Sequence, residues 1–283
     1  MRTKVSRVAL FAVAIGLIGA CANTTDSTDT TGSSSSNQTG FEAAKWASNV
    51  TVTFSNGVMR YRSNGLPNHA RQAEYAVPNP GVRVPNSSTA YALADPTQAQ
   101  SYDFSIPMTP TKGSSPTSTS LGTIGVMISG AALFNPYEGD GVTVAMASNF
   151  TVKNSSGKDV AFLDSCNGHP GPGGMYHYHA LPPCVTATVD VAGAPSHIIG
   201  IAFDGYPIYG DRDNTGKQLT AADLDQCGGV TSPTPEFPNG VYHYVLLNAP
   251  NSTSSIRCFV GKVSSSVAAA QASVSMSMAM GPR

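Results

Sequence analysis

Two stretches of this chain repeat one another and decide the fold. Residues 124–134 read Ile-Gly-Val-Met-Ile-Ser-Gly-Ala-Ala-Leu-Phe, and residues 199–209 read Ile-Gly-Ile-Ala-Phe-Asp-Gly-Tyr-Pro-Ile-Tyr. Both begin with Ile-Gly, carry glycine at the seventh position, and end with an aliphatic residue followed by an aromatic one. Apolar runs of this length predict strands. A repeat of such runs predicts a domain built from two related halves.

The same motifs follow each copy in the same order. Leu163-Asp-Ser-Cys166, Tyr176-His-Tyr-His179 and Cys184 follow the first copy. Leu224-Asp-Gln-Cys227, Tyr242-His-Tyr244 and Cys258 follow the second. The halves therefore span about residues 121–184 and 196–258.

The fold class is predicted as mainly β: a single globular, β-rich and loop-rich domain over residues 41–262. Ser55-Asn56-Gly57 marks a hairpin turn, and 28 glycines and 20 prolines punctuate the loops. A short helical turn, capped by Thr220, is expected only at Thr220–Leu224. The expected strands are Val50–Phe54, Val58–Tyr61, Gly122–Ile128, Val142–Ala147, Thr186–Val191, His197–Phe203 and Val241–Leu247.

The N-terminus has the order of a secretory signal over residues 1–20. Basic Arg2, Lys4 and Arg7 precede an apolar run, Val8–Ile18, that is too short to span a membrane. Ile18-Gly19-Ala20-Cys21 resembles a lipobox, which predicts an exported chain held to a bacterial membrane through a lipid on Cys21. Ordinary cleavage near Ala20, leaving Cys21 as a thiol, is the alternative.

The segments that flank the domain are rich in small and polar residues. Residues 21–40 are predicted to form a flexible Ser/Thr linker, and residues 263–283 a disordered tail. Ala22, rather than aspartate, after the lipidated cysteine is typical of an outer-membrane lipoprotein if the host is Gram-negative.

Charge excludes one class of partner. The chain has 16 basic and 17 acidic residues, and removing the signal leaves 13 basic residues against 17 acidic, a net charge of −4. With no basic patch, nucleic acid is not an expected partner.

Five cysteines are an odd number for an exported protein. Lipidation of Cys21 leaves four, which allow three pairings. The repeat favours Cys166–Cys184 and Cys227–Cys258, one bridge in each half. A thiolate metal site is the weaker alternative, because no C-x-x-C spacing occurs and an exported protein meets an oxidising compartment.

Histidine is scarce, and three of the six lie between positions 169 and 179. In an extended Tyr176–His179 segment, the imidazoles point to one face and the tyrosines to the other. Neutral imidazole is the commonest metal ligand. The sequence therefore predicts a metal site with three or four ligands drawn from His69, His169, His177, His179 and His243.

An all-nitrogen site suits copper, zinc or nickel. Met276, Met278 and Met280 near the C-terminus resemble thioether ligands for Cu(I), which favours copper over zinc. The alternative is that these methionines occur by chance in a low-complexity tail. The residues that could orient the histidines or act as a base are Asp164, Asp204, Tyr176 and Tyr178. The two tyrosines are expected chiefly in the core.

A separate turn resembles the opening of a calcium-binding loop. Asp211, Asp213 and Thr215 place oxygens at alternate positions, and Gly216 stands at the sixth. The twelfth position is Ala222 and not glutamate, so a weak calcium turn or a plain Asp/Gly turn is expected instead of an EF-hand.

These motifs together resemble the YHYH protein family. The matching segments are 63–69, 124–135, 164–169, 174–179, 199–210, 224–227 and 242–244. In the second half, the family places an Asn-Gly-His and a further histidine where this chain carries Gly229 and Val245. The resemblance supports the motifs and implies no activity.

Three functions remain open from the sequence. The first is an envelope lipoprotein with a histidine metal site, for metal handling or a metal-dependent reaction. The second is a hydrolase that uses histidine and aspartate without a metal, although no G-x-S-x-G or H-E-x-x-H element supports it. The third is a disulfide-braced surface interaction module with no catalytic role.

Overall fold

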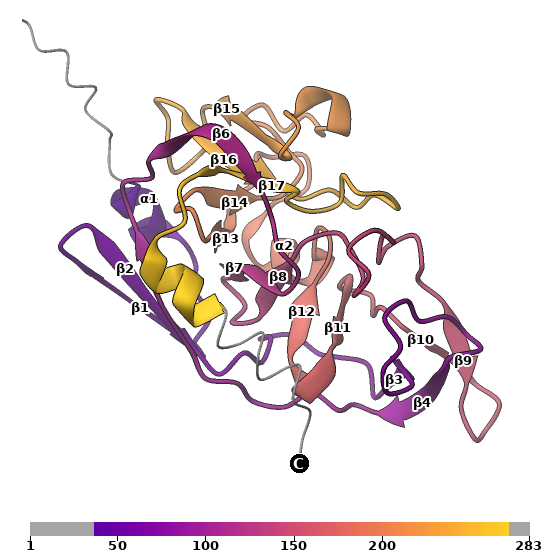
Figure 1. Ribbon diagram of the computed structural model, residues 1–283. Helices are drawn as coiled ribbons and strands as arrows, with labels where there is room; N and C mark the ends of the chain where they lie inside the picture. The colour runs from indigo at the N-terminus through magenta and orange to yellow at the C-terminus, as the bar shows by residue number, and fades with distance from the viewer. Residues whose placement is uncertain (1–36, 272–283) are drawn as a thin grey trace, which may run out of the picture. The chain divides into compact units, whose positions relative to one another are not determined.

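The computed structural model describes residues 37–271 and is organised around an eight-stranded sheet (Figure 1). The strand order is β11-β12-β8-β7-β13-β14-β16-β15. The first half supplies β7 (Thr123–Met127), β8 (Ala132–Phe134), β11 (Gly168–Pro170) and β12 (Tyr176–Tyr178). The second half supplies β13 (Ile198–Ala202), β14 (Pro207–Tyr209), β15 (Gly229–Ser232) and β16 (Val241–Val245).

The order of this sheet confirms the internal repeat. Exchanging β7 with β13, β8 with β14, β11 with β15 and β12 with β16 leaves the order unchanged when it is read from the other end. Each half has an antiparallel hairpin, a parallel pair and a second antiparallel pair. The halves meet where β7 and β13 pair antiparallel.

The glycines of the two Ile-Gly motifs explain how the halves can meet. A Cβ on Gly125 would lie 2.7 Å from the carbonyl oxygen of Ile201, and a Cβ on Gly200 would lie 2.7 Å from that of Val126. Both contacts are too short for any side chain. The seventh-position glycines, Gly130 and Gly205, have φ of +100° and +89°, which glycine adopts without strain.

The remaining strands form smaller sheets around this one. β1 (Val50–Ser55), β2 (Val58–Ser63) and β5 (Tyr102–Pro107) make a three-stranded sheet. It packs on the centre of the large sheet, because the Phe104 ring lies 4.8 Å from that of Phe203. The two-stranded pairs are β3 (Glu74–Pro78) with β4 (Ala90–Ala94), β6 (Lys112–Ser118) with β17 (Cys258–Gly261), and β9 (Thr151–Lys153) with β10 (Asp159–Ala161).

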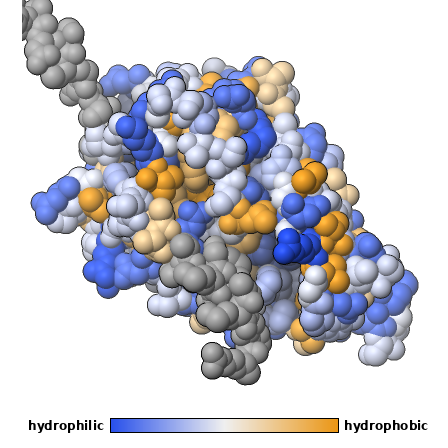
Figure 2. All heavy atoms as spheres, in the orientation of Figure 1, coloured by the Kyte–Doolittle hydropathy of each residue, from blue (hydrophilic) through white to orange (hydrophobic). Residues whose placement is uncertain are grey.

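Both predicted disulfides are present, which confirms the mainly β, disulfide-braced domain. The Cα atoms of Cys166 and Cys184 lie 5.4 Å apart, and those of Cys227 and Cys258 lie 4.7 Å apart. The hairpin at Asn56-Gly57 is also confirmed, with φ of +51° and +72° at the two turn residues. On the face drawn in Figure 2, hydrophobic and hydrophilic residues are interspersed.

Two predicted strands are wrong. Residues 183–189 form helix α2 (Pro183–Val189), which begins at a proline and buries Val185 and Val189, four residues apart on one face. Residues 142–147 form turns, because the Asp140 carboxylate accepts the N–H groups of Val142 and Thr143. Neither segment contributes a strand to a sheet.

Helical structure also extends beyond the one predicted turn. The 3₁₀ helix η2 (Ala221–Asp223) has the expected Thr220 cap. A second, η1 (Pro172–Gly174), and helix α1 (Gln38–Ala43) were not predicted. Residues 265–271 are helical rather than disordered, with Val267 fully buried.

The domain begins before the predicted boundary at residue 41. Asn37 is buried, and its side chain donates to the Gly205 carbonyl at 3.3 Å. The predicted signal, Cys21, most of the linker and the three tail methionines lie outside the described residues. Within residues 37–271, no helix has both the length and the apolar character needed to cross a membrane.

Candidate metal centre

The hairpin β11–β12 brings three histidines together at one edge of the eight-stranded sheet. His169 on β11 lies directly opposite His177 on β12, and His177 pairs with Ala132 on β8. His179 follows two residues later, and its N–H donates to the Asn167 carbonyl at 3.1 Å. Side chains at alternate positions share a face, so all three imidazoles point to the same side.

The ring nitrogens of these histidines converge. Nε2 of His179 lies 3.0 Å from Nε2 of His177 and 3.3 Å from Nε2 of His169. Nitrogens bound at 2.0–2.1 Å around a tetrahedral ion lie about 3.3 Å apart. These two distances are therefore close to those between ligands of one ion, and one ligand atom from each histidine lies within 4.8 Å of the others. Within the described part of the chain, this is one of two groups of three His, Cys, Asp or Glu residues close enough to hold a metal.

Backbone carbonyls fix which nitrogen carries the proton in two of the three rings, those of His177 and His179. Nδ1 of His177 lies 3.0 Å from the Met175 carbonyl oxygen, and Nδ1 of His179 lies 2.9 Å from that of Asn135. A carbonyl only accepts hydrogen bonds, so each Nδ1 must donate and each Nε2 keeps its lone pair. Two lone pairs that face one another at 3.0 Å repel, whereas a cation between them would be bound by both.

Burial keeps these imidazoles neutral. The exposed fractions of His169, His177 and His179 are 7%, 3% and 2%. Phe134 stacks on His177 with ring centroids 3.8 Å apart, and Phe162 lies 4.3 Å from His169. This desolvation lowers the pKa of all three, that of His179 to about 4. The lone pairs are thus available for a metal at neutral pH.

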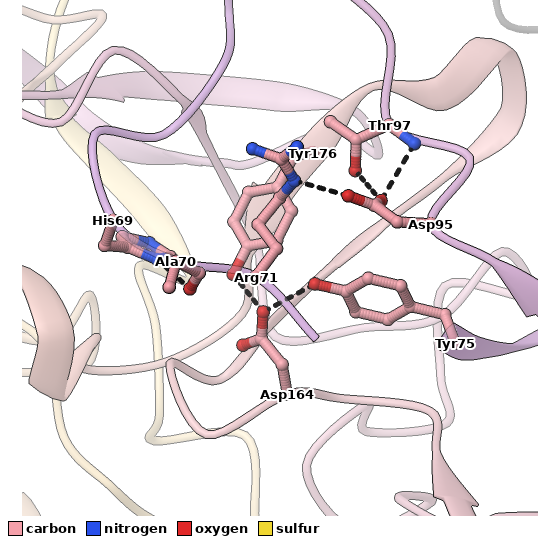
Figure 3. Close-up of polar contacts among 8 residues, drawn as sticks. All are labelled: His69, Ala70, Arg71, Tyr75, Asp95, Thr97, Asp164 and Tyr176. Atoms are coloured by element: carbon pink, nitrogen blue, oxygen red, sulfur yellow. Dashed lines mark hydrogen bonds and ion pairs between the residues drawn. The ribbon is translucent and has the colours of Figure 1, made fainter. Parts of the chain in front are cut away.

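Asp164 stabilises the turn that precedes His169. Its carboxylate accepts the N–H of Cys166 at 2.8 Å and, more weakly, that of Gly168 at 3.3 Å. It also accepts the hydroxyls of Tyr75 at 2.8 Å and Tyr176 at 2.7 Å (Figure 3). These bonds occupy the carboxylate, so Asp164 positions the hairpin and does not face the three imidazoles.

His69 does not join the three histidines. Its Nε2 lies 2.7 Å from the Tyr178 hydroxyl, and its ring centroid lies 5.7 Å from that of Tyr176. Both tyrosines project from the face of β12 opposite to His177. The two tyrosines are fully buried, as expected of core residues. His69 belongs to the other group of potential ligands, with Cys166 and Cys184.

His243 is also separate from the three histidines. It occupies the position equivalent to His177, and its Nδ1 lies 3.1 Å from the Val241 carbonyl, as in the first half. Its partner across the β15–β16 pair is Val230, and Gly229 pairs with Tyr244 as Gly168 pairs with Tyr178. The residue that replaces the missing histidine is therefore Val230, not Gly229, and the other replacement is Val245.

Asp204 is a buried carboxylate of the second half. It occupies the place of Ser129 in the repeat and accepts the Tyr244 hydroxyl at 2.6 Å and the Gly261 N–H at 2.9 Å. Burial raises its pKa to about 6. It lies in the second half and anchors β16, whereas Ser129 contacts Tyr178 at 3.0 Å in the first.

In the calcium-like turn, the carboxylate oxygens accept hydrogen bonds from nearby residues of the same segment. The Asp213 carboxylate accepts the N–H and the hydroxyl of Thr215 and the N–H of Lys217. Asp211 accepts the side-chain amide of Gln218 at 2.8 Å. The groups of potential ligands found among residues 37–271 do not include this turn.

Sequence reasoning missed the carbonyls that orient the rings and the two phenylalanines that enclose them. Met175 immediately precedes the Tyr-His-Tyr-His motif, and Phe134-Asn135 closes the first copy of the repeat. Their position at the end of the first repeat could have indicated Phe134 and Asn135, because the strand that ends there, β8, pairs with β12.

Fold and site define a class: a disulfide-braced β domain with a buried three-histidine cluster on one of its two related halves. The family model of the YHYH protein matches residues 103–218 and 212–261. The chain belongs to the YHYH protein family. Neither the curated proteins nor the solved structures gave a match.

Proposed function

We propose that this chain is an exported, lipid-anchored protein of the bacterial envelope that binds a transition metal ion through His169, His177 and His179. The observation that carries the proposal is the convergence of three buried Nε2 atoms, two of which are left unprotonated because carbonyls hold the opposite ring nitrogens. Ligand rings held through the opposite nitrogen are a general feature of protein metal sites.

Copper is preferred and zinc is the alternative. Three neutral imidazoles suit either ion and leave a further position open. The methionines at 276, 278 and 280 lie outside the described residues and favour copper, because thioethers bind Cu(I). Such a site serves metal handling or a reaction that uses the open position.

The location is supported by two features of the chain. The Ile18-Gly19-Ala20-Cys21 sequence follows an apolar run with a basic start. Both disulfides fit an oxidising compartment. Replacing Cys21 with serine is expected to move the protein from the membrane fraction to a soluble fraction, and to remove the acyl mass from its N-terminus. Unchanged membrane retention and mass would refute the anchor.

The metal site is tested by elemental analysis of the full-length protein purified from membranes. Wild-type protein is expected to hold about one equivalent of copper or zinc, and the His177→Ala, His179→Ala double variant to hold almost none. His243→Ala is the matched control, because it removes a buried histidine from the equivalent strand. Wild-type protein that binds neither metal when either is supplied, yet has a native circular dichroism spectrum, would refute the proposal.

A further inference from the structure

On the tyrosine side of β12, His69, Cys166 and Cys184 form a second group of potential metal ligands, separate from the three-histidine site. His69 Nδ1 lies 3.5 Å from Cys166 Sγ. One ligand atom from each of His69, Cys166 and Cys184 lies within 4.8 Å of the others. The two sulfurs are joined in a disulfide, so the group holds a latent set of two thiolates and one imidazole.

Hydrogen bonds hold the His69 ring in place, as they do for histidines that bind metals. Its Nε2 contacts the Tyr178 hydroxyl at 2.7 Å, and that hydroxyl contacts the Ser129 hydroxyl at 3.0 Å. Its Nδ1 lies 2.9 Å from the Ala70 carbonyl oxygen, so in this state Nδ1 donates and Nε2 accepts. Because both hydroxyls can donate or accept, the ring can change tautomer and offer the Nδ1 lone pair to an ion beside Cys166.

We propose that reduction of the Cys166–Cys184 disulfide creates a second metal site, in which both thiolates and His69 Nδ1 bind a thiolate-preferring cation such as Cu(I) or Zn(II). Soft sulfur ligands favour these ions, and two sulfurs with one nitrogen are a common zinc set. After the tautomer change, His69 Nε2–H would donate to the Tyr178 oxygen and keep the ring in place.

The reduction needs an external dithiol donor, which is oxidised to its own disulfide. A donor thiolate attacks Sγ of Cys184, which is partly exposed, while Cys166 is buried. The sulfur–sulfur bond breaks, and Cys166 leaves as a thiolate beside His69. The donor's second thiol resolves the mixed disulfide, so two electrons and two protons pass to the cysteine pair. The metal then displaces the thiol protons to water.

The second half lacks this arrangement although it has its own disulfide. Tyr244, the counterpart of Tyr178, is bonded to Asp204 and to the Val260 N–H instead of to a histidine. Within the described residues, no group of potential metal ligands includes Cys227 or Cys258. Cys227–Cys258 is therefore a matched control inside the same molecule.

The test uses the full-length protein that carries His177→Ala and His179→Ala, so that it does not depend on the three-histidine site. Co(II) is the probe, because thiolate ligation gives it an intense charge-transfer band in the near ultraviolet. After reduction by a phosphine, one equivalent of Co(II) is expected to produce the band, and the oxidised protein is expected to give none. Adding His69→Ala should weaken binding at least tenfold, while adding Cys227→Ser with Cys258→Ser should leave it unchanged.

Three outcomes would overturn the inference. The first is a reduced protein that does not bind Co(II). The second is unchanged affinity in the His69→Ala variant, since the thiolates would then act alone. The third is binding that is lost equally with either cysteine pair, or that accompanies loss of the near-ultraviolet circular dichroism spectrum, because an unfolded chain would then be the ligand.

Discussion

The two halves of this domain share a scaffold and differ in chemistry. In both, the aspartate of Leu-Asp-x-Cys accepts the N–H of the cysteine and of a glycine, and the hydroxyl of the first tyrosine of Tyr-His-Tyr. In both, the second tyrosine hydroxyl is bonded to the sixth residue of the repeat. These shared contacts build strands and turns, so they are the structural part of the motif.

The difference lies in the residues that face the hairpin interior. His169, His177 and His179 of the first half correspond to Val230, His243 and Val245 of the second. The fold tolerates valine at two of the three positions, which shows that histidine there is not needed to form the sheet. The first half is therefore where the potential metal ligands are concentrated.

Converting the first half to the second should have the largest effect. His169→Val with His179→Val is expected to reduce metal affinity by more than about 100-fold, because two of three ligands are lost. The metal-free fold should remain, since the second half already packs valine at these places. Isothermal titration and circular dichroism measure the two effects. Retained affinity would place the metal elsewhere.

Converting the second half to the first should create a site. Val230→His with Val245→His completes a cluster around His243, and the metal content is expected to rise by about one equivalent per chain. His243 Nδ1 is already held by the Val241 carbonyl, so its Nε2 lone pair is oriented. Elemental analysis gives the result, and adding His243→Ala should reverse the gain. If the variant folds but its metal content does not rise, then equivalent backbone positions are not enough to form a metal site.

The two turn aspartates should differ in their contribution to stability. Asp164 is 8% exposed and accepts two tyrosine hydroxyls, whereas Asp225 is exposed and accepts one. Asp164→Ala is expected to lower the free energy of unfolding by about 3–4 kcal/mol, since it leaves buried donors unpaired. Asp225→Ala should cost about 1 kcal/mol. Urea unfolding measures both, and equal losses would contradict the comparison.

Asp204 should give the second half a pH dependence that Ser129 does not give the first. Burial raises its pKa to about 6, so the folded state holds the proton more tightly than the unfolded state does. Its stabilising contribution is fully present below the unfolded pKa of about 4 and is lost as pH rises through about 6. The loss amounts to about 2–3 kcal/mol.

Asp204→Asn removes this titration and keeps an acceptor for Tyr244. The variant is expected to gain stability relative to the wild type between pH 4.5 and pH 7.5, by up to about 2 kcal/mol. Urea unfolding at both values, with Ser129→Ala as a variant without a titrating group, checks the sign. A difference that shrinks as pH rises would contradict the raised pKa.

Much of the fold could be predicted from the sequence, because many of its strands and turns follow local sequence patterns. Alternation predicted β1, the Asn56-Gly57 turn predicted β2 as its partner, apolar runs predicted β7 and β13, and the repeat predicted both disulfides. The prediction from sequence was wrong at α2, where β-branched residues suggested a strand. There, a proline at the first helical position and the burial of Val185 and Val189 outweighed the strand propensity of the segment.

The alternation in Tyr176-His-Tyr-His179 determined by itself that the histidines share one face and the tyrosines the other, because successive side chains of a strand point to opposite sides. Only the tertiary structure decided which distant residue meets each face. His169 reaches the histidine face because β11 pairs with β12, while the segment after β2 returns His69 to the tyrosine face. Those contacts depend on how loops close through space, which spacing along the chain does not encode.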